Sequence, residues 1–160
     1  WDHDPNDPTQ QCTMSFDKAE AFGGTGFSLK VDYDVDSPNP AFNGVWMSLQ
    51  GSNLSSHKNL TFYVRGDAAR GYTTQIKLEL KNNKVVPYLG DDGTESRRYE
   101  ASQTILKGIT DQWQQVSVPL SSFGGLSDWN DMREFVIVFD DLTSTKKTGT
   151  IYLDEIWFEN

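Results

Sequence analysis

Apolar and polar residues alternate with a period of two along most of this chain. In the segment FSLKVDYDV, residues 27–35, every odd position is apolar and every even position is polar. Successive side chains of a β-strand point to opposite faces of a sheet, so the pattern predicts a strand with one buried and one solvated face. Turn-forming stretches such as DSPNPAFNG and LGDDG separate this segment from others like it. We predict strands near residues 27–36, 44–50, 60–66, 73–81, 97–106, 113–119, 134–140 and 150–158.

These strands predict an all-β fold, namely a two-sheet antiparallel β-sandwich of the jelly-roll type. Consecutive strands of a jelly roll alternate between sheets, which places 27–36, 60–66, 113–119 and 150–158 in one sheet and the other four in the second. The segment LSDWNDMRE, residues 126–134, is the one candidate for a short helix, with Ser127 as its N-cap.

The chain has 160 residues, which is about the size of one domain. Residues 1–12, rich in Asp, Pro and Asn, are predicted to be a linker or N-terminal arm, and residues 13–160 the sandwich. The chain lacks an initial Met and a signal peptide, so we expect an excised domain or a processed product. The single cysteine, Cys12, excludes an internal disulfide.

The formal net charge of −9 argues against nucleic acid and anionic membranes as partners. Catalytic signals are weak, because His3, His57 and Cys12 have no evident partners and no nucleophile, phosphate-binding or zinc motif occurs. The sequence therefore predicts a domain that is not an enzyme. An alternative is a polysaccharide lyase or hydrolase that uses Glu79 with Tyr99 or Arg97.

The last third contains the frame W-x-x-V-x-V-P-L-x-x-F at 113–123, followed by DW and then by GTIYLDEIWF at 149–158. This frame resembles bacterial β-sandwich carbohydrate-binding modules of the galactose-binding-like jelly-roll type. The resemblance is nearest to family 11 and looser to family 30, and it covers residues 15–159.

The resemblance implies a non-catalytic, monomeric module that binds a polysaccharide, with a β-glucan preferred, in a shallow cleft. It also implies a covalently attached glycan-degrading catalytic domain and an extracellular location. Because the same frame occurs in sandwich domains whose sugar binding is less certain, a structural or assembly domain of a secreted protein is the alternative.

Asp154 and Glu155 are adjacent acids within the last predicted strand. Alternation sends one of them inward unless a bulge intervenes, and a buried carboxylate needs a partner. The resemblance implies a structural calcium ion where the first and last strands meet, with Asp17 and Asp154 as ligands and with Glu20 or backbone carbonyls from around residues 26–30 completing the shell. The alternative is that Asp154 accepts hydrogen bonds from backbone amides or pairs with Lys30.

Sugar rings stack on aromatic side chains, so an aromatic residue in the polar register of a strand marks a candidate binding face. Trp46 occupies this register in VWMSL, unless a loop or the arm covers it. The outward positions of the second sheet give the candidate carbohydrate-binding residues Trp46, Lys77, Glu79, Arg97 and Tyr99. Arg98 is an alternative to Arg97, because the alternation in SRRYEAS is ambiguous.

Several basic residues could form a strip on this sheet: Lys77, Lys81, Lys84, Arg97 and Arg98. Such a strip would suit an acidic polysaccharide, whereas a lattice of paired Lys and Glu would suit a neutral glucan, which we prefer. The remaining tryptophans of the sandwich are predicted to pack, with Trp113 and Trp129 in the core and Trp157 against its neighbours.

Overall fold

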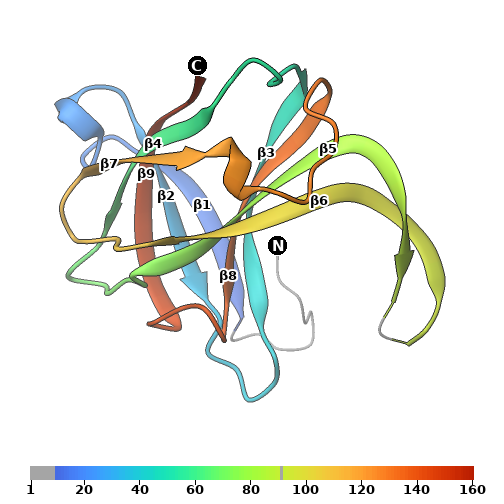
Figure 1. Cartoon of the computed structure of the whole chain (residues 1–160). Coiled ribbons are helices and arrows are strands. Elements are labelled where there is room, and N and C mark those ends of the chain that lie inside the picture. The colour runs from blue at the N-terminus through green and yellow to red at the C-terminus, as the bar shows by residue number, and fades with distance from the viewer. Residues whose placement is uncertain (1–9, 91) are drawn as a thin grey trace.

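The computed structural model describes residues 10–90 and 92–160. Within these residues the chain forms nine strands and two short 3-10 helices, arranged as two sheets that pack face to face (Figure 1). The strands are β1 (Gln11–Asp17), β2 (Ser28–Asp34), β3 (Phe42–Ser52), β4 (Asn59–Gly66), β5 (Gln75–Leu89), β6 (Glu95–Lys107), β7 (Gln114–Pro119), β8 (Met132–Asp140) and β9 (Thr148–Glu159), and the helices are η1 (Phe22–Gly24) and η2 (Leu120–Ser122).

One sheet has five strands in the order β1-β2-β9-β4-β7, and the other has four in the order β3-β8-β5-β6. Every pair of neighbouring strands is antiparallel. The predicted antiparallel two-sheet sandwich is therefore confirmed, as is the assignment of all eight predicted strands to the two sheets.

The core forms between the apolar faces that alternation predicts. In β2, Val31 and Tyr33 are buried, whereas Lys30 and Asp32 on the other face stay partly exposed. Burying such side chains contributes about 1.5–3 kcal/mol each to the free energy of unfolding. The largest fully buried side chains come from both sheets and include Leu60, Phe62, Ile76, Leu78, Leu80, Phe135, Ile137, Phe139 and Ile151.

Two local predictions differ from the structure. Strand β1 is not among the eight predicted segments, and it begins at Gln11, inside the predicted arm; residues 1–9 of that arm lie outside the described part of the chain. The predicted helix over 126–134 is wrong, because residues 126–131 are irregular and Met132 begins β8. Ser127 does not cap a helix, since its N–H and hydroxyl both donate to Glu100.

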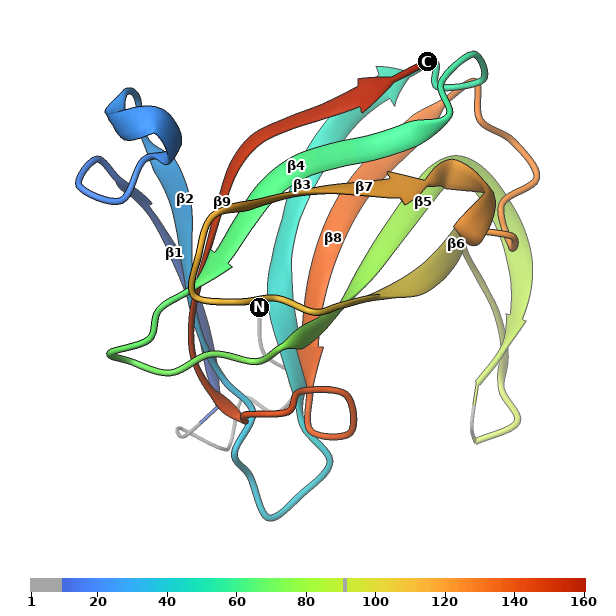
Figure 2. The ribbon, with the colours of Figure 1, turned by 60° about the vertical axis from the view of Figure 1, so that its left-hand side comes forward.

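Strands β5 and β6 run well beyond the predicted ends. Strand β8 pairs with β5 as far as Asn82, and from there the described residues of β5 and β6 pair with each other. Figures 1 and 2 show this hairpin curving away from the sandwich. We call residues 83–99 the β5–β6 arm. At its base Lys81 pairs with Ala101 and Val85 with Tyr99, so three residues of β5 bulge out opposite a single residue of β6.

Candidate functional site

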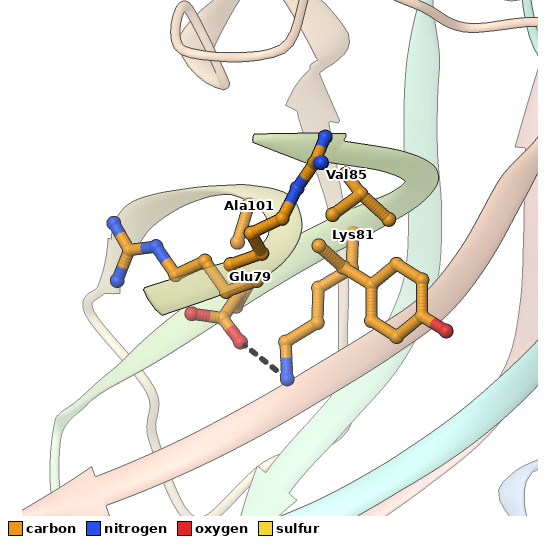
Figure 3. Close-up of a pocket in the computed structure, with 7 residues that line it drawn as sticks. Glu79, Lys81, Val85 and Ala101 are labelled. Atoms are coloured by element: carbon orange, nitrogen blue, oxygen red, sulfur yellow. Dashed lines mark ion pairs between the residues drawn. The ribbon is translucent and has the colours of Figure 1, made fainter. Parts of the chain in front are cut away.

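The outer face of the four-stranded sheet is hollowed where the β5–β6 arm leaves the sheet. This hollow, the Tyr99 pocket, has a volume of about 480 Å³ (Figure 3). Its walls come partly from the sheet and partly from the arm, so the bend between them shapes it. Its lining residues are Glu79, Lys81, Val85, Arg97, Arg98, Tyr99 and Ala101.

A second hollow, the Trp46 pocket, has a volume of about 470 Å³ and involves the edge strand β3. Trp46 pairs with Val136 of β8, and its side chain is 55% exposed. Its lining residues are Trp46, Ser48, Gln50, Gly51, Asn83, Asp131, Arg133 and Glu134.

Arg133 and Glu134 connect the two hollows. The Arg133 guanidinium lies 4.0 Å from the centre of the Tyr99 ring, a cation–π contact, and its Nε donates to Glu134 Oε1 at 3.1 Å. Glu134 in turn lies 3.3 Å from Lys81 of the Tyr99 pocket. The two hollows therefore adjoin on this face, each with a partly exposed aromatic ring, and we call them together the groove.

The lysines of this face are already paired with acids. Lys81 lies 3.1 Å from Glu79 and Lys77 lies 2.6 Å from Asp140. Burial alone would raise the pKa of Asp140, but the Lys77 ammonium and the Thr143 N–H together lower it below its usual value. The face is therefore a lattice of paired charges along β5, and within the described residues Arg97 and Arg98 of the arm form no ion pair.

The structure places the predicted binding residues on one face. Glu79, Arg97 and Tyr99 line the Tyr99 pocket, Trp46 lines the neighbouring pocket, and Lys77 lies on the same face but lines neither. Arg98, the alternative to Arg97, also lines the Tyr99 pocket, and its guanidinium lies over Tyr88 at 4.1 Å.

Sequence reasoning missed Arg133, Glu134, Asn83 and Asp131. The alternation of EFVIVF at 134–139 could have placed Glu134 on the outer face. Arg133 reaches the same face through the irregular pairing at the start of β8, and Asn83 reaches it from the bulge of β5. Arg133 has no such signal, because it is an extra residue of β8 between Met132 and Glu134, whereas Asn83 keeps the odd-numbered register of Glu79 and Lys81.

Glu100 lies opposite the bulge at the base of the arm and is buried. Its Oε2 accepts from Asn82 Nδ2 at 2.7 Å and from the Ser127 N–H at 2.8 Å. Its Oε1 lies 3.3 Å from Lys84 Nζ. Burial would raise the pKa of Glu100, but these donors lower it to about 2. The carboxylate is therefore charged at neutral pH and fully used within the protein.

The adjacent acids of β9 are explained by a bulge. Tyr63 of β4 pairs with Asp154 and Thr61 with Trp157, so β9 contains one extra residue here. Glu155 has a φ of 45° and is exposed, so neither acid points into the core. Asp154 accepts from the N–H groups of Phe22 and Glu155, each at 2.8 Å. These two contacts are of the kind that the backbone-amide alternative for Asp154 describes.

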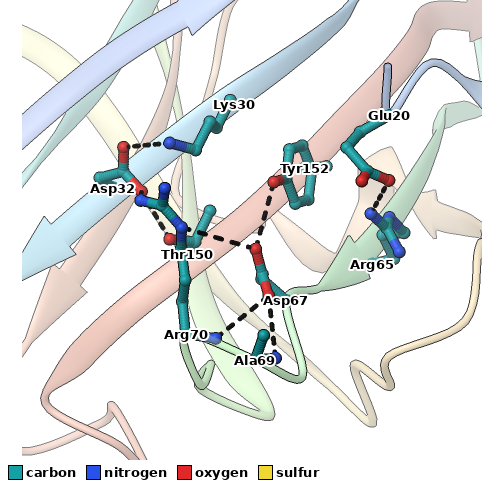
Figure 4. A network of polar contacts seen from close by, with 9 residues as sticks. All are labelled: Glu20, Lys30, Asp32, Arg65, Asp67, Ala69, Arg70, Thr150 and Tyr152. Carbon is teal, nitrogen blue, oxygen red and sulfur yellow. Dashed lines mark hydrogen bonds and ion pairs between the residues drawn. The ribbon is translucent and has the colours of Figure 1, made fainter. Parts of the chain in front are cut away.

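The other two predicted calcium ligands also have partners within the protein. Asp17 Oδ1 accepts from the N–H groups of Ala19 at 2.9 Å and Glu20 at 3.2 Å. Glu20 forms an ion pair with Arg65 (Figure 4). Among the described residues no three His, Cys, Asp or Glu side chains gather as a metal site. Asp17, Glu20 and Asp154 thus do not fit a shared calcium site in this arrangement, and calcium stays a prediction.

The predicted packing of the tryptophans is only partly confirmed. Trp129 packs against the core as predicted. Trp113, predicted to lie in the core, instead lies half-buried outside it, with its ring 5.9 Å from that of Phe22 and edge-on to it. Trp157 packs against Tyr63 at 6.4 Å, as expected. Both residues belong to the outer face of the five-stranded sheet, where η1 and its flanking loop cover part of the surface.

A family model described as carbohydrate binding domain 30 matches residues 1–160. The chain belongs to this family. Domains of this kind are typically non-catalytic, bind carbohydrate and occur in secreted proteins attached to enzymes. No curated protein matches this family 30 domain. None of its described helices is long and apolar enough to cross a membrane.

Solved structures support the fold. The domain is similar to the family 11 carbohydrate-binding module of the cellulosomal cellulase Lic26A-Cel5E of Clostridium thermocellum, with 13% identity, a TM-score of 0.69 and coverage of 100% of this chain and 85% of that one. A structure described for the promiscuous specificity of β-sandwich carbohydrate-binding modules gives 14% identity and a TM-score of 0.54, covering 95% and 54%. The structure of an exo-β-agarase gives 12% identity and a TM-score of 0.53, and the match covers 98% of this chain and 24% of that one.

Proposed function

We propose that this family 30 domain binds a neutral β-glucan chain in the groove formed by the Tyr99 and Trp46 pockets. The main support for this proposal is a pair of exposed aromatic residues in adjoining hollows of one sheet face: Trp46 is 55% exposed and Tyr99 is 39% exposed. The apolar faces of pyranose rings stack on such rings, while polar groups beside them bind the hydroxyls. Glu79, Gln103 and Arg133 provide those polar groups.

The paired charges favour a neutral glycan over a uronate polymer. An acidic polysaccharide needs uncompensated cations, yet Lys77 and Lys81 are held by Asp140, Glu79 and Glu134. Of the described arm cations, Arg97 and Arg98 form no ion pair with another described residue, and two such charges are too few to outweigh a net charge of −9.

The domain then acts by targeting. We propose that it is part of a longer secreted protein and holds an attached glycan-degrading enzyme at the polysaccharide, which raises the local substrate concentration. The fold likeness to a module of a cellulosomal cellulase supports this proposal.

Native affinity electrophoresis against mixed-linkage β-glucan, xyloglucan, glucomannan, xylan, pectin and alginate tests the proposal. We expect retardation by a neutral β-glucan and its loss in Trp46→Ala. Retardation by pectin or alginate alone would indicate an acidic polysaccharide as the ligand, bound at the side of the groove that contains Arg97 and Arg98. No retardation by any glycan would favour a structural domain. Product release that disappears in Glu79→Gln would favour an enzyme.

A further inference from the structure

Glu100 lies next to the candidate groove without being part of its lining. It follows Tyr99 on β6, so its side chain points to the opposite face of the strand. The residue is only 9% exposed. A glycan bound in the groove does not reach its carboxylate, and any influence on binding must pass through the residues that the carboxylate holds.

The Glu100 carboxylate joins three segments of the chain. It accepts from Asn82 and Lys84 in the β5 bulge and from Ser127 in the loop before β8. Asn82 Nδ2 also donates to the Asp128 carbonyl at 2.8 Å, which closes the connection between bulge and loop. Hydrogen bonds to an ionised, buried carboxylate are among the strongest in proteins. The cluster therefore acts as a clamp at the base of the β5–β6 arm.

The clamp lies at the point where β5 stops pairing with β8. Strand β8 pairs with β5 no further than Asn82, and beyond that point the described arm residues pair across their own hairpin. Further contacts fasten the arm to the start of β8: the Asn83 backbone N–H and side-chain amide both donate to Asp131, and Arg133 donates to Asn83 and lies over Tyr99. The Tyr99 pocket has one wall on each side of this junction: Val85, Arg97 and Tyr99 from the arm, and Glu79, Lys81 and Ala101 from the sheet. Its shape therefore depends on the angle between arm and sheet.

We propose that Glu100 is a positioning residue for glycan binding, whose carboxylate fixes the β5–β6 arm so that Tyr99 and Arg97 stand ready at the groove. This inference rests on the proposed function. A pre-organised site binds more tightly because the ligand does not have to order it. With the clamp removed, a glycan must order the arm as it binds, and its affinity falls although no contacting residue has changed.

The test is Glu100→Gln, which keeps the size of the side chain but places an amide NH₂ among donors. Affinity for a mixed-linkage β-glucan hexasaccharide is measured by calorimetry well below the unfolding temperature. We expect a loss of about fivefold, in the range of coupling between neighbouring residues. Ser127→Ala, which removes one hydroxyl of the clamp, is the milder variant if Glu100→Gln does not fold, and we expect about a twofold loss.

Asp67→Asn is the matched control. Asp67 also accepts two backbone N–H groups and one side-chain donor, but on the outer face of the other sheet. The Asp67→Asn variant should have a lower melting temperature and an unchanged affinity for the β-glucan hexasaccharide. If Glu100→Gln behaves in the same way, the residue is merely structural and the inference is overturned.

A double-mutant cycle provides the readout that general destabilisation cannot imitate. If Glu100 acts through the arm, its substitution should have little further effect on affinity in a Tyr99→Ala background, and a full effect in a Trp46→Ala background. Equal losses in both backgrounds would overturn the inference. A wild-type domain that binds no glycan would instead overturn the proposed function, and this inference with it.

Discussion

The two outer faces of the sandwich contain similar residues in different states. On the five-stranded sheet the aromatic rings cover one another: Phe22 of η1 stacks on Tyr63 at 3.6 Å, and the Arg65 guanidinium lies between Trp113 and Tyr152. On the four-stranded sheet, Trp46 and Tyr99 are exposed, and Arg133 lies over the Tyr99 ring. The number of aromatic residues on a face therefore does not identify a binding site. What distinguishes the four-stranded face is that Trp46 and Tyr99 remain partly exposed, Tyr99 with one ring face under Arg133.

The two outer faces also differ in what their charged side chains contact. On the five-stranded sheet, Asp67 and Asp32 share Arg70, and Tyr152 donates to Asp67 (Figure 4). This network links β2, β9 and the loop after β4, so it supports the fold. On the four-stranded sheet, the ion pairs of Lys81 with Glu79 and Glu134 lie in the open groove. They can exchange partners with sugar hydroxyls without opening the fold.

The sharpest test of this contrast is removal of one aromatic ring from each face. Trp46→Ala and Tyr99→Ala should each lower the affinity for β-glucan by at least about tenfold, because buried aromatic anchors dominate binding energy. Tyr63→Ala should leave that affinity unchanged and lower the melting temperature, since Tyr63 stacks on Phe22. Calorimetry and thermal melts on the three variants measure both quantities. Loss of affinity in Tyr63→Ala would place the site on the opposite sheet.

A pair of arginine variants should separate stability from binding. Arg65→Ala removes the ion pair with Glu20 and the contacts to two rings, and we expect a loss of about 1–2 kcal/mol in the free energy of unfolding. Arg97→Ala, on the exposed arm, should leave the free energy of unfolding unchanged and weaken glycan binding instead. Urea unfolding and calorimetry distinguish the two. If both variants changed only the free energy of unfolding, or only the glycan affinity, the contrast between the two faces would be wrong.

The clamp predicts a pH dependence with a definite sign. The pKa of Glu100 is depressed to about 2 in the folded protein, so its stabilising contribution is complete above its unfolded pKa and is lost as pH falls toward 2. The unfolded pKa of a Glu is about 4.3. The melting temperature of the wild type should therefore exceed that of Glu100→Gln at pH 6, and the gap should narrow between about pH 5 and pH 2. A gap that stays constant over this range would exclude the ionised clamp.

How far the sequence could predict this molecule depends on where its period of two holds. Alternation assigned all eight predicted strands to the correct sheets and placed Trp46 in an outward position, because regular strands keep their parity. It failed at the two bulges. The bulge at Glu155 turns both adjacent acids away from the core, and the irregular pairing of β8 brings Arg133 into the groove although alternation would place it inward.

Some contacts at these irregular pairings are local, since Asp154 accepts from the Glu155 N–H and Asn82 Oδ1 from the Lys84 N–H, but others are not. Asp154 finds its partner in Phe22, and Glu100 finds its partners in Ser127 and Asn82, all of which are distant along the chain. The helix wrongly predicted at 126–134 fails for the same reason, since the N–H of Ser127 has a tertiary acceptor. Long-range hydrogen bonds decide these positions, and local propensity cannot anticipate them.

Chelation is the test in which we expect the smallest effect. With Asp154 bound to backbone N–H groups and Glu20 paired with Arg65, the geometry predicts that a chelator leaves the melting temperature almost unchanged. The resemblance predicts that a chelator lowers the melting temperature, because a calcium ion would link the end of β1 to β9. Melts in calcium and in chelator, for wild type and Asp154→Ala, separate the two. A decrease that Asp154→Ala abolishes would mean that calcium draws these acids away from the partners seen here, and that the outer face of the five-stranded sheet is held by a metal as well as by its aromatic rings.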